Sequence, residues 1–159
     1  MFPTKSWQGW RTMAVEGKIR PIVLAAIVRP SDHALLVFRG YNSRQAQHFY
    51  RPLGGGIEFG ETSQQALQRE ILEELGVAVR PVRKLATLES IFMHEGVPGH
   101  EIVIVWLAEF IDPALYLEEA LPYTEGDHQS VAIWVNPARL QAQGIPLYPV
   151  GLTELLQGV

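Results

Sequence analysis

The stretch from residue 54 to residue 77 reads GGGIEFGETSQQALQREILEELGV, a glycine triplet followed by the pattern of a helix. Thr62 is a favourable N-cap residue, and Gln65 three positions later completes a capping box. Gly76 stands where a left-handed C-cap residue is expected. Three successive glycines indicate close backbone approach or unusual dihedral angles. The stretch therefore predicts a glycine-rich segment and then one helix that ends at Gly76.

One face of this helix is apolar. Leu67, Ile71 and Leu75 recur every four residues and form a stripe, which Leu72 widens. We expect the stripe to pack against the rest of the fold and the glutamates of the helix to lie on the face turned away from it.

Three of these glutamates, Glu70, Glu73 and Glu74, are related by spacings of three and four residues, so we expect their carboxylates to converge. Like charges at these spacings cost about 0.2–0.5 kcal/mol per pair. The helix dipole disfavours negative charge in the last turn by about 0.3–1 kcal/mol per group. A divalent cation would turn both penalties into attractions, and carboxylate oxygens suit Mg²⁺ or Mn²⁺. A solvated acidic helix face is the alternative reading of the glutamates alone.

Composition narrows the class of protein. The chain has 159 residues, 47% of them apolar and 19% charged, a net charge of −4 and a pI near 5.7, which fits one globular domain. It has no run of Lys or Arg, so we expect no nucleic-acid partner. The absence of Cys excludes thiolate chemistry and suits a cytoplasmic location. The longest apolar stretch, residues 22–28, falls far short of the roughly 20 residues of a spanning helix, so we expect no membrane association.

Strand patterns surround the helix. Residues 19–28 read as a buried strand, and residues 34–39 as the antiparallel strand that returns beside it, followed by a polar loop over residues 40–48. Residues 77–93 read as one or two strands, and after a turn at residues 95–99 the longest strand is expected over residues 100–111.

The C-terminal third adds one strand and two short helices. We expect a Pro-broken acidic loop over residues 112–129, a strand at 130–135, and helical turns at 136–143 and 149–157. The whole pattern predicts a single α/β domain with a mixed sheet, over residues 18–159. Residues 1–17 are expected to form an N-terminal leader segment.

The central stretch also matches a known motif. Nine residues stand at the fixed positions of the 23-residue Nudix box, and they are Gly55, Glu61, Arg69, Glu70, Ile71, Glu73, Glu74, Gly76 and Val77. The chain therefore resembles the Nudix hydrolase family over most of residues 18–157. The resemblance implies an α/β/α sandwich with a mixed sheet. It also implies metal-dependent hydrolysis of the pyrophosphate in a nucleoside diphosphate linked to another group, by attack of water on phosphorus.

The resemblance also suggests roles in the box. Glu73 and Glu74 resemble the principal metal ligands, and the backbone carbonyl of Gly55 resembles a further one. Glu70 resembles either a third ligand or the base that activates water, and these readings stay open. The expected cofactor is Mg²⁺ or Mn²⁺.

Other residues are expected to support this chemistry. Glu61 and Arg69 resemble the ion pair that ties the loop to the helix, and Gly76 has a structural role in the motif. Arg51, just before the glycines, could reach a substrate phosphate or be a charge at a strand edge. Glu101 opens a long buried strand and is a candidate base or metal ligand, although a glutamate at a strand start needs no function.

Two groups outside the box stay ambiguous in the sequence. The acidic residues of the 112–129 segment read as solvated surface, although one of them could approach the site; they are Glu118, Glu119, Glu125 and Asp127. Four aromatic residues read as core or as platforms for a nucleotide base, namely Phe49, Tyr50, Phe92 and Trp106.

The resemblance implies a small-molecule nucleotide as substrate and allows a homodimer. Downstream signatures of hydrolases for ADP-ribose, dinucleoside polyphosphates and NADH are missing from residues 88–101, which leaves nucleoside triphosphates and nucleotide sugars open. The alternative function is a non-catalytic Nudix-fold module that binds or senses a nucleotide. Because such modules usually lose box glutamates and this chain keeps all of them, the hydrolase is favoured.

Overall fold

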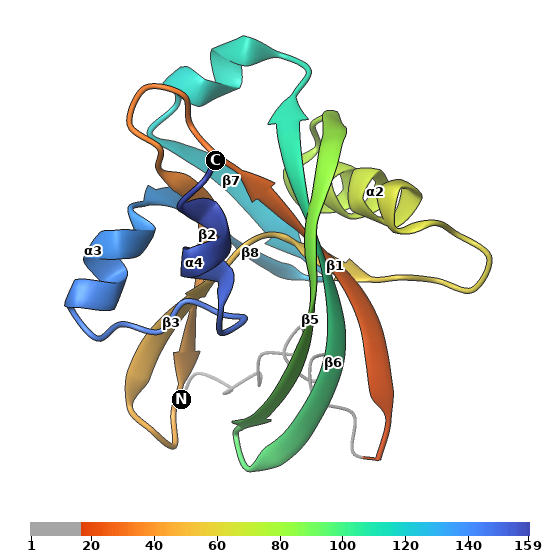
Figure 1. Ribbon diagram of the computed structural model, residues 1–159, viewed down its shortest axis with the longest axis vertical. Helices are drawn as coiled ribbons and strands as arrows, with labels where there is room; N and C mark the ends of the chain where they lie inside the picture. Colours follow the sequence, from red (N-terminus) through yellow and green to blue (C-terminus); the bar gives the residue numbers. More distant parts are fainter. Residues whose placement is uncertain (1–16) are drawn as a thin grey trace.

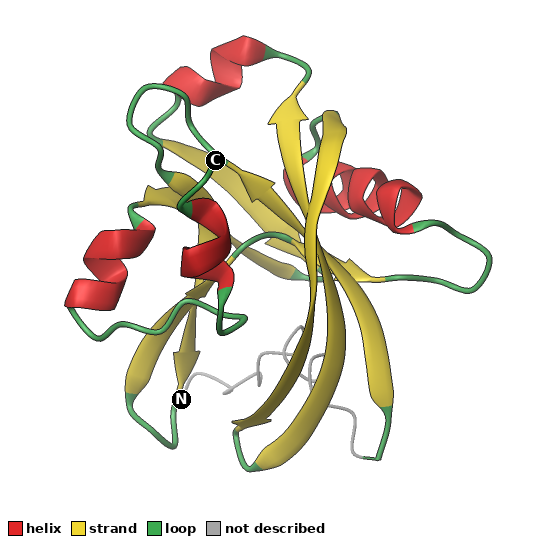
Figure 2. Cartoon of the chain, viewed as in Figure 1, coloured by secondary structure: helices red, strands yellow, loops and turns green. Residues whose placement is uncertain are grey.

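The computed structural model describes residues 17–159, so residues 1–16 of the expected leader lie outside the described residues. Two four-stranded β-sheets carry helices on both sides (Figures 1 and 2). The strands are β1 (Ile19–Ile27), β2 (Leu35–Asn42), β3 (Gln47–Arg51), β4 (Gly54–Gly56), β5 (Val79–His94), β6 (Val97–Phe110), β7 (Ala120–Glu125) and β8 (His128–Val135). The helices are α2 (Ser63–Leu75), the 3₁₀ helix η1 (Pro113–Leu117), α3 (Pro137–Ala142) and α4 (Leu152–Leu156). Within residues 17–159, none of the helices has the length and apolar character needed to cross a membrane.

The two sheets differ in strand direction. The first has the order β4-β1-β6-β5 and is mixed, because β1 and β6 are parallel while the other pairs are antiparallel. The second has the order β3-β2-β8-β7 and is antiparallel throughout. The predicted α/β class and mixed sheet are thus confirmed, but the single sheet expected from the sequence is two sheets.

Neighbouring residues of β1 pack into two different hydrophobic cores. Val23 packs in one core with Leu67 and Ile71 of α2. Leu24 packs in the other with Leu152 of α4. Because β1 is buried on both faces, its sequence is apolar at consecutive positions instead of alternating. The result is the layered arrangement of Figure 1, in which α2 and α4 lie on opposite sides of the strands.

The caps of α2 are those that the sequence predicts. The Thr62 side chain accepts a hydrogen bond from the Gln65 backbone N–H, and the Gln65 side chain accepts one from the Thr62 N–H. Gly76 ends the helix in the left-handed region with φ 68°. The apolar stripe is narrower than predicted, because Leu72 is 57% exposed. One step along the helix turns Leu72 about 100° away from the buried Ile71.

Two expectations about the first half of the chain are wrong. Residues 34–39 do not form a strand paired with β1, because β2 pairs with β3 and β8 instead. One isolated bridge, between Val28 just after β1 and Leu35, is the pairing that remains. The polar loop over residues 40–48 is mostly strand, because β2 runs to Asn42 and β3 starts at Gln47. Hydrophobic periodicity identifies a strand but not its partner.

Two further segments differ from the sequence prediction. The segment predicted as one or two strands at 77–93 forms one strand, β5, which extends to His94. Its 16 residues make it longer than the 14-residue β6, and the turn between the two strands is only Glu95 and Gly96. Residues 112–129 contain η1, β7 and the start of β8 where a loop was predicted. Pro122 is compatible with a strand here because β7 is an edge strand of its sheet. The short helices predicted near both ends of residues 136–157 are present as α3 and α4.

The glycine triplet is a short strand pressed against β1. Gly54, Gly55 and Gly56 pair with Leu24, Val23 and Ile22 respectively. A Cβ atom at Gly54 would lie 2.0 Å from the Val23 carbonyl oxygen, and Gly54 has φ 144°. A side chain at this position would clash with the β1 backbone, and the positive φ is one that residues other than glycine rarely adopt. Position 54 therefore requires glycine.

We expect Gly54→Ala to lower the free energy of unfolding by at least about 2 kcal/mol, because the added methyl group meets rigid backbone. Urea denaturation measures the loss. Gly158→Ala is the matched control, since an added Cβ there meets nothing within 4 Å. Equal stability of the two variants would contradict the close approach.

Candidate active site

A cleft of about 420 Å³ lies between α2, β4 and the ends of β6 and β7. Six carboxylates line it, and they belong to Glu58, Glu70, Glu73, Glu74, Glu101 and Glu125. Arg20, Arg51 and the three glycines of β4 line it as well. The structure thus brings Gly55, Arg51 and the four glutamates named as site candidates into one cleft.

Arg69 connects the loop before α2 to the helix. Its Nη2 lies 2.6 Å from Glu61 Oε1, its Nε donates to Glu61 Oε2 at 3.1 Å, and Nη2 also donates to the Gly56 carbonyl at 2.9 Å. Its Nη1 donates to Glu70 at 2.7 Å and lies 3.5 Å from Glu73. The hydrogen bonds from Arg69 hold the pKa of Glu61 below its ordinary value. The ion pair expected between Glu61 and Arg69 is therefore present and reaches both the loop and the glycine strand.

Glu74 does not lie on the outward face of α2 where the sequence placed it. Its side chain is buried, with 7% exposure, and accepts a hydrogen bond from the Gly54 N–H at 3.2 Å. Burial raises the pKa of Glu74 well above its ordinary value, and the charges of Glu125 and Glu70 raise it further. The sequence missed this burial because it depends on β4 and β7 packing over the last turn of α2.

Glu70 occupies the space that the missing side chain of Gly55 leaves. A Cβ at Gly55 would lie 2.4 Å from the Glu70 carboxyl carbon and 2.5–2.6 Å from its two oxygens. Burial raises the pKa of Glu70, and the bond from Arg69 opposes this rise. Glu73 differs from both neighbours, since its side chain is 60% exposed. The three box glutamates therefore meet three different environments within one cleft.

Glu101 lies between two arginines. Its side chain is almost completely buried, and Oε2 accepts a hydrogen bond from Arg51 Nη2 at 3.0 Å. Arg20 Nη1 forms an ion pair with Oε1 at 3.6 Å, too far for a hydrogen bond, so both of these buried atoms lack a hydrogen-bond partner. Arg51 is itself buried, with 7% exposure. The charge of Glu101 is thus matched by arginines that also face the carboxylate cleft.

Sequence reasoning missed Arg20 and Tyr123 and left Glu125 among four surface acids. Arg20 reaches the site because β1 and β6 are parallel, which sets it opposite Glu101 in the register. Tyr123 donates to Glu125 at 3.0 Å, and burial together with the charges of Glu74 and Glu125 raises the pKa of Tyr123. The sequence near Arg20 does not show that β1 pairs with β6, and the sequence near Tyr123 does not show that β7 packs beside the box. Gly76 stays a helix cap and lies outside the cleft lining.

The side chains fit a divalent cation in chemistry but are not gathered around one point. Among residues 17–159, no three carboxylate or imidazole groups are close enough to act together as metal ligands. Arg69 holds Glu70, and Glu74 turns to the Gly54 amide. The donors are nevertheless all oxygen, and carboxylates outnumber the arginines of the cleft. An excess of buried negative charge with oxygen donors is what Mg²⁺ or Mn²⁺ would neutralise.

Comparison with known proteins assigns this architecture to a family. The family model described as NUDIX domain matches residues 18–152. The NAD-capped RNA hydrolase NudC of Edwardsiella ictaluri is 32% identical over 93 residues, which are 58% of this chain and 32% of that protein. The chain thus spans about a third of the length of that relative.

Solved structures show the same fold over most of the chain. The E. coli ORF135 protein has a TM-score of 0.55 and 25% identity, with 88% of this chain and 87% of that chain covered. The MutT NUDIX hydrolase of Burkholderia pseudomallei has a TM-score of 0.60 and 24% identity, with coverage of 89% and 98%. The predicted sandwich of sheets and helices is therefore confirmed by both comparisons.

We expect Glu74→Gln to stabilise the metal-free protein, and more so at alkaline than at acidic pH. Folding raises the pKa of this carboxyl group. Below the pKa of the unfolded state the group is protonated in both states and does not change the free energy of unfolding. As the pH rises above about 5, the group favours the unfolded state, and the free energy of unfolding falls. Glutamine removes that cost and can still accept from the Gly54 amide. Thermal unfolding in chelator across pH measures the difference. Glu73→Gln, at an exposed carboxylate, is the control, and an equal pH dependence in both variants would refute the burial effect.

We expect Arg69→Lys to loosen residues 57–62 without unfolding the protein. A lysine cannot replace the guanidinium fork that binds Glu61 and the Gly56 carbonyl together. Losing these charge-assisted bonds should weaken the local structure by roughly 1–2 kcal/mol. Hydrogen exchange of the loop amides measures this as faster exchange. Arg80→Lys, in the exposed Arg80–Glu109 pair, is the control, and unchanged exchange in both variants would exclude a tethering role.

Proposed function

The chain belongs to the Nudix family, and from this membership we propose that it hydrolyses the pyrophosphate bond of a nucleoside diphosphate linked to another group. The observation that supports the proposal most is the single cleft in which the box glutamates face Arg20 and Arg51. Carboxylates and arginines that line the same cleft can together hold a metal-bound pyrophosphate. The chain also keeps each glutamate of the box.

The proposed cofactor is Mg²⁺ or Mn²⁺. Glu73 and Glu74 would hold it, together with the carbonyl oxygen of Gly55. When bound, such a cation supplies charge neutralisation and polarises the phosphoryl oxygens. Glu74 is suited to this role because its carboxylate is buried beside Glu125 and Glu70, so that a cation would relieve its unfavourable environment.

Glu70 was expected to be either a third metal ligand or the base that activates water, and we propose that it is the base. It lies inside the cleft above Gly55, where it can accept the proton of the attacking water. The water oxygen forms a bond to phosphorus, the bridging oxygen–phosphorus bond breaks, and the leaving phosphate keeps the electron pair. Glu61 and Arg69 hold the loop and Glu70 in place during this step.

Arg51 and Glu101 are proposed to act on the substrate side. Because Glu101 accepts from Arg51 and lies beside Arg20, it can orient both guanidinium groups towards phosphate oxygens. Arg51 retains further donors for this purpose, since a guanidinium has five N–H groups. Glu101 is therefore assigned as the residue that positions the arginines instead of as the base.

The substrate class is proposed to be small nucleotides, with nucleoside triphosphates and nucleotide sugars first. The relative from Edwardsiella ictaluri is named an NAD-capped RNA hydrolase, so that NAD and NAD-capped RNA also belong among the candidates. Against them, the chain has no NADH-type string after the box and no run of basic residues. Cytoplasmic action and a homodimer are part of the proposal and rest on the sequence arguments alone.

We expect the protein to release phosphate or nucleotide from one substrate class only in the presence of Mg²⁺ or Mn²⁺. Glu73→Gln should lower kcat by at least about 100-fold, the scale of losing an electrostatic group at a reacting phosphate. A panel of nucleoside triphosphates, nucleotide sugars, ADP-ribose, NADH, dinucleoside polyphosphates and NAD-capped RNA identifies the class by product chromatography.

Glu119→Gln is the matched control, since Glu119 is exposed and lies outside the lining of the cleft. Near-normal activity of Glu73→Gln would overturn the ligand assignment. Binding of nucleotides with no hydrolysis in any metal would favour the nucleotide-sensing module over the enzyme.

A further inference from the structure

The mixed sheet ends in a long edge strand. In the order β4-β1-β6-β5, β5 pairs with β6 on one side, and no other described strand pairs with it. In Figure 1 it runs down beside β6 to the turn at the bottom of the view. Its 16 residues contrast with the other sheet edges, since β4 has three residues, β3 five and β7 six. A long edge presents a row of backbone N–H and C=O groups to which another strand can bind.

The first half of β5 carries the features that keep an edge strand from pairing. Pro81 lacks a backbone donor, and Arg83 and Lys84 add positive charge. The register with β6 also shifts twice, between Pro81 and Arg83 and between Lys84 and Ala86. Proline, lysine and bulges are the devices with which natural proteins protect exposed edges. The first half of β5 is therefore unsuited to a further strand.

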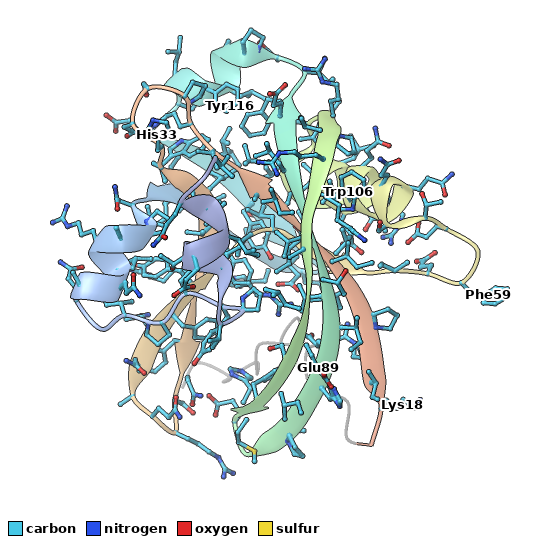
Figure 3. All side chains as sticks on the ribbon, in the orientation of Figure 1. Lys18, His33, Phe59, Glu89, Trp106 and Tyr116 are labelled. Carbon is cyan, nitrogen blue, oxygen red and sulfur yellow. The ribbon has the colours of Figure 1, made fainter. Side chains whose placement is uncertain are left out.

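The second half of β5 lacks these features. From Ala86 to His94 the register with β6 is uninterrupted. The stretch reads ATLESIFMH, without proline and with Glu89 as its one acidic or basic residue apart from the histidine. Glu89 lies on the lower part of β5 (Figure 3), and its Oε1 is 2.9 Å from His100 Nε2 on β6. Glu89 is therefore bonded within its own sheet instead of guarding the edge.

Large apolar side chains on this stretch are exposed. One face of the sheet carries alternate residues of the stretch, namely Thr87, Glu89, Ile91 and Met93. Ile91 is 73% exposed and Met93 is 58% exposed. Neither hydrophobic core of the described residues includes them. An unprotected edge with exposed apolar side chains has the properties of a contact surface for another strand.

A second copy of the same stretch is a partner that fits it. Two antiparallel strands related by a two-fold axis pair with each other, so that one surface serves both copies. The uninterrupted stretch, residues 86–94, has its midpoint at Ser90. With the axis there, the whole stretch pairs, and Glu89 faces Ile91 of the second copy. An axis one residue earlier would set the two Glu89 carboxylates opposite each other, which is unfavourable.

We propose that two copies of this protein form a homodimer by antiparallel pairing of their β5 strands over residues 86–94, with the two-fold axis at Ser90. The inference rests on the homodimer that is part of the proposed function and gives it an interface, whereas hydrolysis is not needed for it. The exposed Ile91 side chains of the two copies become diagonal neighbours, within reach of each other. Because the pairing uses the long edge of both copies, the assembly closes as a dimer.

A single engineered cysteine tests the axis, because the chain has no cysteine of its own. In Ser90→Cys the two thiols would face each other at the Cα separation of about 4.5–5.5 Å that opposite residues have and a disulfide spans. We expect mild oxidation to give a covalent dimer in non-reducing electrophoresis. Thr87→Cys is the matched control on the same strand. Its two copies would lie about 20 Å apart along the paired strands and should not cross-link.

A change of charge tests the register. Sedimentation equilibrium over a range of concentrations should show a wild-type dimer that dissociates on dilution. Ile91→Glu should raise the dissociation constant at least about 10-fold, because the new carboxylate faces Glu89 of the second copy, twice in each dimer. Ile91→Lys should keep the dimer, since its ammonium group faces the same carboxylate. Val150→Glu is the control, because Val150 is 81% exposed just before α4, and it should sediment as wild type does.

Two further measurements complete the test. Circular dichroism melting establishes that each variant is folded. Hydrogen exchange should show that the amides of residues 87–93 exchange more slowly in the dimer than after dilution. Slow exchange of these amides in a monomer would place another segment of the same chain on the edge and would overturn the inference.

Three other results would also overturn it: a monomer at every concentration, equal cross-linking of Ser90→Cys and Thr87→Cys, or equal weakening of the dimer by Ile91→Glu and Ile91→Lys. These results are separate from failure of the hydrolysis. A monomer that cleaves a nucleotide would leave the pyrophosphohydrolase standing, and a dimer linked at Ser90 without any hydrolysis would leave only the interface standing.

Discussion

The contact between the β4 glycines and the last two turns of α2 is the constraint on which the rest of the site depends. Gly54 approaches β1 so closely that its backbone becomes part of the mixed sheet, and its amide donates to Glu74. Gly55 leaves the space that the Glu70 carboxyl group occupies. A side chain at Gly54 would press β4 away from β1, and one at Gly55 would displace the Glu70 carboxyl group. The apolar stripe of α2 adds the burial that holds this arrangement together.

Charge organises the site around that contact. Arg69 matches the carboxylates nearest the loop, and the pair of Arg20 and Arg51 matches Glu101 on the far side. Glu74 and Glu125 also line the cleft, and burial, followed by the charges of Glu125 and Glu70, raises the pKa of Glu74. The protein thus keeps an unfavourable centre of negative charge at Glu74. A fold that retains such an unfavourable centre is suited to a ligand that carries positive charge.

Two cavities meet at Arg51 and Glu101. The carboxylate cleft takes seven of its 17 lining residues from the box. A neighbouring cavity, which Phe49, Phe92 and Tyr148 help to line, is built mainly from β2, β3, β5 and β6, outside the box. Arg51 and Glu101 belong to both, which makes their ion pair the boundary between them. The strand ends that line the second cavity can therefore change in sequence without altering the packing of Gly54 and Gly55 against β1 and α2.

The sequence by itself determined the local features: the caps at Thr62 and Gly76, the buried Leu67 and Ile71, the glycine approach and the family motif. Each follows from residues close together in the chain, where capping and periodicity have direct physical meaning. Tertiary structure alone decided the split into two sheets, the burial of Glu74, the pairing of Arg20 with Glu101 and the placing of Phe92 over Gly99. These depend on which strands lie side by side and in which register, because a strand's alternation fixes its faces but leaves its neighbours open.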